Sequence, residues 1–102
     1  MDSLTALNKV MDVIKYNFFL LNTFEDAYLF GSTLKGIEKI NDIDILLIYK
    51  DFSEDIVTKT CAIRDLLEHV TGISADITTL SEHELAETRF LQELNGVYLK
   101  IK

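Results

Sequence analysis

The sequence contains no proline and only four glycines among its 102 residues, so it lacks the Pro- or Gly-rich stretches that link separate domains. It also has no internal repeat. A chain of this length is expected to form one domain, because two cores of half the size would each be too small to be stable. We therefore expect a single domain over residues 1–102.

Cysteine and long apolar runs are also scarce. Cys61 is the only cysteine, which excludes an intramolecular disulfide and a zinc site built from several cysteines. The longest apolar runs, residues 18–21 and 45–49, reach about five residues, whereas a membrane-spanning helix needs about 20. No basic segment followed by an apolar stretch and a cleavage site opens the sequence. These absences predict a cytoplasmic protein without a membrane-spanning segment.

Basic residues are outnumbered by acidic ones. Ten Lys and Arg stand against seventeen Asp and Glu, giving a formal net charge of −7, and the basic residues form no stripe along the sequence. Sequence-independent binding to nucleic acid depends on Lys and Arg side chains that neutralise phosphates. The charge therefore argues against a nucleic-acid partner.

Hydrophobic residues are plentiful, at 48% of the chain, and their spacing in the first half predicts a helix and a strand. Residues 3–22 have the apolar rhythm of an amphipathic helix, with Ser3 as its N-cap. Residues 26–30 are aromatic-rich and stop at Gly31, as expected of a strand that ends in a tight turn. The apolar run 18–21 is assigned to the core, with contact of part of it with a partner as the alternative. The expected buried stripe of the helix consists of Leu4, Leu7, Val10, Met11, Ile14, Phe18 and Leu21.

The middle of the chain predicts the central strand. Residues 33–41 are polar and form a connection with at most one helical turn. Residues 43–49 follow, and from Ile45 onward they are apolar on both faces, which is typical of a strand covered on both sides.

The second half predicts a helix, a strand, a helix and a short strand. A helix begins after Ser53 and stops at Gly72, with Cys61 as a small packed residue, and residues 73–80 form the next strand. Ser81 and Glu84 have the spacing of a capping box, which opens a helix that runs to Gly96. The last six residues alternate like an edge strand. The order is α-β-β-α-β-α-β, which predicts an α/β (α+β) fold with a small mixed sheet packed against helices.

Two aspartates at the start of the central strand are the main candidates for chemistry. Asp42 and Asp44 are two residues apart, so both point to one face of the strand, about 6.6 Å apart. Their repulsion is on the order of 2.5 kcal/mol at an effective dielectric of about 20, and a divalent cation would reverse its sign. Mg²⁺ suits such a pair because it takes one or two carboxylates together with waters and phosphate oxygens. The alternative is a polar turn that leads into a strand.

Two further residues, Asp76 and Lys35, and the turn at Gly31-Ser32 could complete this site. Asp76 is the lone acid of the third strand, and it can face Asp42 and Asp44 if that strand lies beside the central one; a solvated acid is the alternative. Gly31 allows turn dihedrals closed to other residues, and Ser32 offers a hydroxyl and an N–H group to a phosphate, with Lys35 as a nearby cation. The chain has no Walker A motif, since no G-K-[ST] follows. His69 and His83 are isolated, and we expect no catalytic role for them.

These motifs together resemble the signature of the DNA polymerase beta-like nucleotidyltransferase superfamily. In this chain the motifs are Gly31-Ser32, nine intervening residues, Asp42-Ile43-Asp44 before an apolar strand, and the later Asp76. In length and element order the whole chain is similar to minimal nucleotidyltransferases (MNT), including the antitoxins of HEPN/MNT toxin–antitoxin pairs. The spacing between serine and aspartate is one residue shorter than is common in the family.

The resemblance implies a nucleotidyltransferase fold and a Mg²⁺-dependent transfer of a nucleoside monophosphate, AMP from ATP, to an acceptor hydroxyl. It implies that Asp42 and Asp44 hold two Mg²⁺ ions on the triphosphate and that Gly31 and Ser32 bind its phosphates. Asp76 would bind the catalytic metal and help to deprotonate the acceptor. The acceptor would lie on a partner such as a HEPN toxin. Two alternatives remain open: an inactive module that neutralises its partner by contact, and transfer to a small molecule such as an aminoglycoside. The sequence leaves the oligomeric state open.

Overall fold

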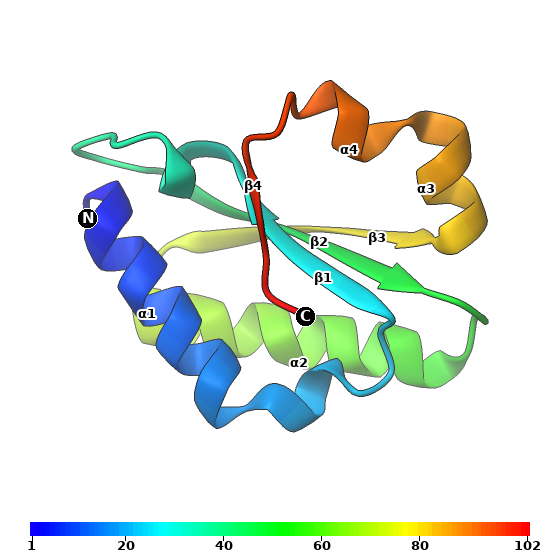
Figure 1. Cartoon of the computed structure of the whole chain (residues 1–102). Coiled ribbons are helices and arrows are strands. Elements are labelled where there is room, and N and C mark those ends of the chain that lie inside the picture. The colour runs from blue at the N-terminus through cyan, green and yellow to red at the C-terminus, as the bar shows by residue number, and fades with distance from the viewer.

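The computed structural model describes all of residues 1–102 and contains one four-stranded sheet of mixed direction with helices on both faces (Figure 1). The strands lie in the order β3-β2-β1-β4. The elements, including two 3-10 turns (η1 and η2), are α1 (Ser3–Tyr16), η1 (Phe18–Leu21), β1 (Asp26–Phe30), η2 (Gly31–Leu34), β2 (Asp42–Tyr49), α2 (Glu54–Thr71), β3 (Ser74–Ser81), α3 (Glu82–Thr88), α4 (Phe90–Glu93) and β4 (Tyr98–Lys100). The mixed α/β fold and the order of elements are as predicted.

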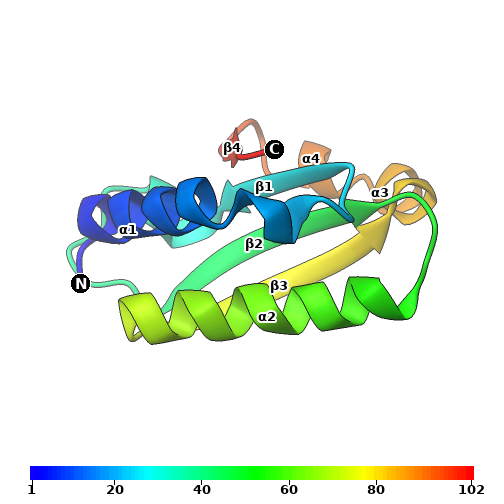
Figure 2. The same cartoon turned by 90° about the horizontal axis from the view of Figure 1, so that it is seen from below.

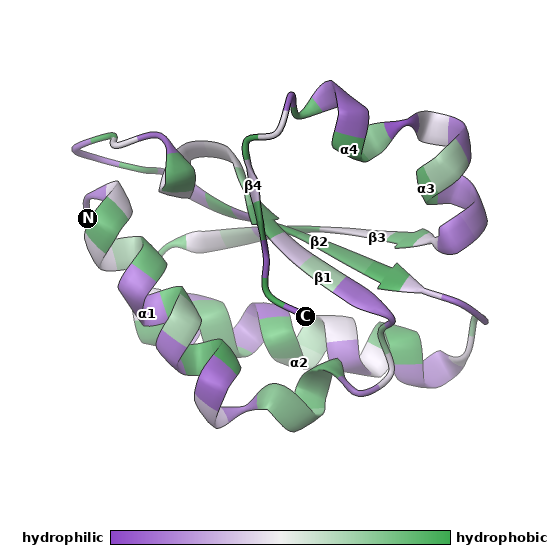
Figure 3. Ribbon diagram, in the orientation of Figure 1, coloured by the Kyte–Doolittle hydropathy of each residue, from purple (hydrophilic) through white to green (hydrophobic).

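β2 is the central strand that the sequence predicts. It pairs with β1 in antiparallel fashion and with β3 in parallel. Residues 45–48 have no solvent-exposed surface, because helices cover both faces of the sheet there. Figure 3 shows the arrowhead of β2 in the green of hydrophobic residues. The predicted edge strand is also confirmed, since β4 pairs only with β1.

The first helix differs from the prediction at both ends. Its N-cap is Asp2, whose side chain accepts a hydrogen bond from the Thr5 N–H at 2.7 Å, and not Ser3. The helix ends at Tyr16, after which the chain tightens into η1. A 3-10 turn has three residues per turn, so the helical spacing no longer decides which side chains are buried there.

The predicted stripe is confirmed in part, because Val10, Ile14 and Leu21 are buried and Leu7 is partly buried. The buried residues of α1 are Ser3, Ala6, Val10, Val13 and Ile14. Leu4 and Met11 are exposed, and so are Phe18 and Phe19 of the apolar run that was assigned to the core. Cys61 is likewise exposed on α2, against the prediction of a packed residue.

α1 and α2 lie together on one face of the sheet (Figure 2). Their inward residues form the larger hydrophobic core with the odd-numbered residues of β2, which are Ile43, Ile45 and Leu47. α2 ends as predicted, because Gly72 takes the left-handed conformation (φ 70°) that terminates many helices. No helix combines the length and the apolarity that a membrane span requires.

α3 and α4 lie on the opposite face and cover only part of it (Figure 1). They pack on a small core around Tyr28, Leu46 and Ile48. The capping box at Ser81 and Glu84 is present, but the predicted helix to Gly96 is interrupted at Arg89, which has a left-handed conformation (φ 55°). The break folds α4 back toward the sheet, where Phe90 contacts Phe30 with ring centroids 5.4 Å apart. The early part of β2 stays uncovered on this face.

Candidate functional site

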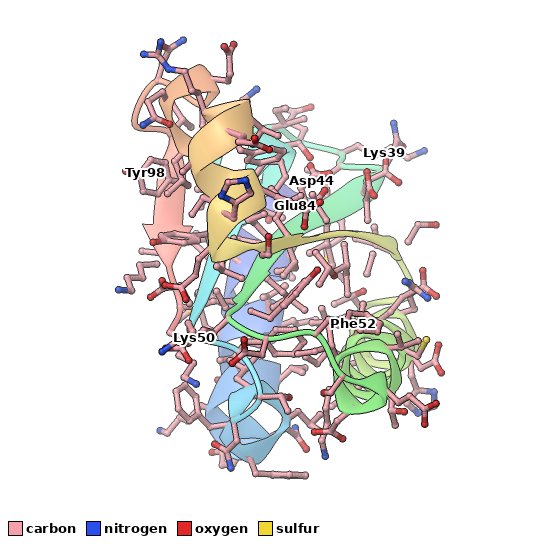
Figure 4. All side chains as sticks on the ribbon, turned by 90° about the vertical axis from the view of Figure 1, so that its right-hand side faces the viewer. Lys39, Asp44, Lys50, Phe52, Glu84 and Tyr98 are labelled. Atoms are coloured by element: carbon pink, nitrogen blue, oxygen red, sulfur yellow. The ribbon has the colours of Figure 1, made fainter.

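Three aspartates share the uncovered part of the sheet. Asp44 pairs in register with Asp76 of the parallel strand β3, and Asp42 lies two residues earlier on β2. Alternate residues of a strand point to one face, and neighbouring strands are about 4.8 Å apart, so the three side chains rise from one small area. Figure 4 shows Asp44 on the side of the sheet that carries α3. The prediction that Asp76 lies beside the other two is confirmed by this register.

Asp44 is the most perturbed of the three. It is half-buried at the lip of the core, whereas Asp42 and Asp76 are exposed. Loss of solvent raises its pKa above the ordinary aspartate value, and the charges of Asp76 and Asp42 raise the pKa further. Lys35 acts in the opposite direction. The chain thus keeps a carboxylate where its own charge is unfavourable, which a cation would relieve.

Gly31 lies directly against Asp44. It follows the last residue of β1, Phe30, which pairs with Asp44, and it has a positive φ of 76°. A Cβ atom at this position would sit 2.1 Å from Asp44 Oδ2, closer than any real contact. Only glycine therefore fits here, for its dihedrals and for the space.

Ser32 ties the turn to the start of β2. Its hydroxyl donates to the Asp42 carbonyl oxygen at 3.3 Å, across the nine residues that separate them in the sequence. The turn that the sequence assigns to phosphate binding therefore contacts both aspartates of β2, through Gly31 at Asp44 and Ser32 at Asp42.

Ser3 supports the same turn from below, a role that sequence reasoning missed. Its buried hydroxyl lies 2.8 Å from the Ser32 carbonyl and accepts a 2.7 Å hydrogen bond from the Ile37 N–H. Its own N–H donates to the Ile37 carbonyl at 2.8 Å. The sequence contains a signal for this role, because Asp2 and Ser3 are both residue types that cap helices. Only one of them is needed as the cap of α1, which leaves the other free for another contact.

The donor set fits Mg²⁺, although no metal cluster is pre-formed. Nowhere in the chain do three Asp, Glu, His or Cys side chains converge closely enough to hold an ion. Mg²⁺ does not need three, because it commonly uses one or two carboxylates and completes its shell with waters and phosphates. Asp42 and Asp44 supply two oxygen donors on one face, and mutual repulsion keeps unshielded carboxylates apart.

The other reactive side chains lie outside this area. His83 pairs with Glu87 at 3.3 Å on the exposed side of α3, and His69 is exposed on α2. Cys61 is also on α2, where Arg64 Nη1 lies 4.0 Å from its sulfur. None of them faces the aspartates.

Solved structures with this fold include two toxin–antitoxin complexes. One is a complex of a tri-AMPylated HEPN toxin from Shewanella oneidensis with its MNT antitoxin (18% identity, TM-score 0.59, covering 95% of this chain and 71% of that one). Another is the toxin–antitoxin pair MntA–HpeT, in a mutant that replaces two aspartates two residues apart by glutamate (20% identity, TM-score 0.58, covering 93% of this chain and 71% of that one). A candidate nucleotidyltransferase from Sulfolobus solfataricus is also similar (19% identity, TM-score 0.54, covering 96% of this chain and 80% of that one).

At these identities the likeness establishes a shared fold. No curated protein sequence matches the chain significantly. The model of the nucleotidyltransferase domain family matches residues 14–98, a range that includes the Gly31-Ser32 turn and all three aspartates. The chain therefore belongs to the nucleotidyltransferase domain family.

Proposed function

We propose that this chain is a Mg²⁺-dependent nucleotidyltransferase that moves AMP from ATP onto an acceptor hydroxyl of a partner protein of the HEPN type. The observation that carries the proposal is the contact of Gly31 with Asp44, whose register partner is Asp76. It joins a turn suited to phosphate with carboxylates suited to a cation. A face left open by α3 and α4 gives the substrates room.

In the proposed reaction, Asp42 and Asp44 would hold Mg²⁺ together with the triphosphate, and Asp76 would be a further ligand. The bound ions would supply charge neutralisation for the attacking and leaving oxygens. Gly31 and Ser32 orient the phosphates through backbone N–H groups, and the Ser32 hydroxyl can join them when it exchanges the Asp42 carbonyl oxygen for a phosphate oxygen. Lys35 adds a positive charge beside them.

The bond changes balance without any further reactant. The acceptor oxygen attacks the α-phosphorus of ATP, and the bond from that phosphorus to the bridging oxygen of the β-phosphate breaks. Pyrophosphate leaves with the electron pair, and the proton of the acceptor hydroxyl passes to Asp76. The exposure of Asp76 supports this role, because an acceptor can reach it from solvent.

The choice of partner rests on the family and the fold. An MNT antitoxin of the same fold forms a complex with a tri-AMPylated HEPN toxin. A HEPN-type protein encoded beside this one is therefore the acceptor that we propose.

The test is label transfer from α-labelled ATP, GTP, CTP or UTP to that neighbouring protein in the presence of Mg²⁺. We expect transfer from ATP, and a loss of about 10³-fold or more in the double variant Asp42→Ala, Asp44→Ala, since metal ions contribute several kcal/mol to such reactions. The matched control replaces two exposed acids on α1 and α2, Asp12→Ala and Asp65→Ala, and should transfer normally. Transfer that survives in the first variant would refute the site.

Two other results would favour the alternatives. Tight complex formation with the partner, without transfer or Mg²⁺ binding, would identify an inactive module that acts by contact. Transfer to an aminoglycoside but not to the protein would identify a small-molecule enzyme.

A further inference from the structure

A cavity of about 440 Å³ opens beside the Gly31-Ser32 turn, between the end of β1 and α4. Gly31 contacts Asp44 and also lines this cavity, which Asp44 does not line. Lys35 lines it as well. The cavity is thus separate from the aspartates but joined to them through Gly31.

One wall of the cavity is apolar. It consists of Phe30, Leu94 and Val97. Phe30 is fixed by its edge-to-face contact with Phe90, which holds α4 on the sheet. Asn95 and Gly96 both have positive φ values, 51° and 79°, and this turn leads from α4 into β4 through Val97. Leu94 and Val97 lie in this turn, which is closed by a 3.0 Å hydrogen bond from the Val97 N–H to the Leu94 carbonyl.

The remaining lining is polar. Glu93 and Asn95 contribute a carboxylate and an amide, and Lys35 contributes an ammonium group on the side of the turn. The cavity thus combines an apolar wall, hydrogen-bonding groups and a cation, and two of its lining residues, Gly31 and Lys35, also act on Asp44. A molecule with a flat, partly apolar end and an anionic end matches this arrangement.

We propose that this cavity binds the nucleoside part of the nucleotide, with the base against Phe30, Leu94 and Val97. The inference rests on the proposed function, which places the triphosphate at Gly31, Ser32 and the aspartates. Glu93 and Asn95 then face the polar edges of the base or the ribose. A purine covers more of the apolar wall than a pyrimidine, so the cavity favours ATP and GTP over CTP and UTP.

The test compares ATP with inorganic tripolyphosphate, which has the phosphates but no nucleoside. Both are titrated calorimetrically, with Mg²⁺, into the full chain. The variant Val97→Trp fills the cavity, and Val70→Trp is its matched control, because Val97 and Val70 are 42% and 41% exposed and Val70 lies on α2. We expect Val97→Trp to weaken the affinity for ATP about tenfold or more and to leave the affinity for tripolyphosphate unchanged. Val70→Trp should change neither affinity.

A second variant removes part of the wall instead of filling the space. Leu94→Ala should weaken ATP by about threefold to tenfold, again without an effect on tripolyphosphate, because it deletes apolar contact with the base. It keeps the test decisive if the tryptophan variant does not fold, and circular dichroism identifies that case.

Four outcomes would overturn the inference, and they are distinguishable. If the unmodified chain binds ATP and tripolyphosphate equally well, the phosphate site stands and the nucleoside cavity does not. Equal weakening of both ligands in Val97→Trp would also refute a cavity for the base. If that variant binds ATP normally but loses transfer to the partner, the cavity holds the acceptor. If the unmodified chain binds neither ligand, the proposed function fails as well.

Discussion

The two faces of the sheet are built from the same strands but are covered to different extents. Under α1 and α2, residues Ile43, Ile45 and Leu47 of β2 join one continuous core. On the other face, Leu46 and Ile48 are covered by α3 and α4, while Asp42 and Asp44 are left beyond the edge of that cover. The comparison shows how one strand can stabilise the fold with one face and offer a site on the other. The following predictions test that difference, from the largest expected effect to the smallest.

The larger core should be the more sensitive one. Leu47→Ala should lower the free energy of unfolding by about 3–4 kcal/mol, because it leaves a cavity where packing is continuous. Its neighbour Leu46 is equally buried but belongs to the small core, which can relax by movement of α3 and α4, so Leu46→Ala should cost about 2 kcal/mol. Urea unfolding measures both. Equal costs would show that the two faces do not differ in this way.

A comparison of Gly31 with Gly36 separates the cost of backbone strain from the cost of a steric clash. Gly31 and Gly36 have φ values of 76° and 65°, but only Gly31 has a neighbour, Asp44, where a Cβ would lie. Gly36→Ala should therefore cost only the backbone strain, about 1–2 kcal/mol, and Gly31→Ala about 2–3 kcal/mol. Gly31→Ala should also abolish binding of tripolyphosphate with Mg²⁺, whereas Gly36→Ala should retain it. Normal binding by both variants would contradict the role of the turn.

Ser3 should matter more than an ordinary helix-start serine. Ser3→Ala removes the hydroxyl that bonds Ser32 and Ile37, and should cost about 1–2 kcal/mol and weaken tripolyphosphate binding. Ser53, which makes no side-chain bond at the start of α2, is the matched control, and Ser53→Ala should have little effect. Unfolding and titration experiments on the two variants decide the point. Equal losses would mean that Ser3 has no special link to the turn.

The smallest predicted effect has the opposite sign. Asp44 has a raised pKa, so between its unfolded and folded values the folded chain binds more protons, and stability falls as the pH rises through that window. Asp44→Asn should therefore raise the free energy of unfolding at pH 7 in the absence of Mg²⁺, by roughly a few tenths of a kcal/mol at most, because solvent screens a half-buried carboxylate. The gain should vanish in acid, below the ordinary aspartate pKa.

Asp12→Asn, at an exposed acid of α1, is the control for this gain. A loss of stability in Asp44→Asn at pH 7 would contradict the picture of an unfavourable charge.

Much of the fold was predictable because local signals and burial agree. The strand at Asp26–Phe30 was predicted with its bounds, and the helix that ends at Gly72 and the capping box at Ser81 were found from single residues. The buried stripe of the first helix was predicted only in part, because Leu4 and Met11 match a helical stripe but are exposed, while the smaller Ala6 is buried. Spacing identifies an amphipathic face without saying what covers it.

The part of the candidate site that could be predicted is the part that follows from the alternation of side chains along a strand. Parity places Asp42 and Asp44 on one face, and the parallel pairing of two strands then brings Asp76 beside them. The position of Ser3 and the cavity at Val97 depend on contacts between distant parts of the chain, which no local pattern records. The roles of these residues in nucleotide transfer remain predictions.

The most direct test of the account is the titration of the Asp44 carboxyl group, followed by carbon NMR with and without Mg²⁺ and ATP. The account predicts a pKa above the ordinary aspartate value in the free chain, because of lost solvent and the charges of Asp76 and Asp42, and a marked fall when Mg²⁺ and ATP bind. An ordinary pKa in the free chain, or a titration curve that saturating Mg²⁺ and ATP leave unchanged, would contradict it.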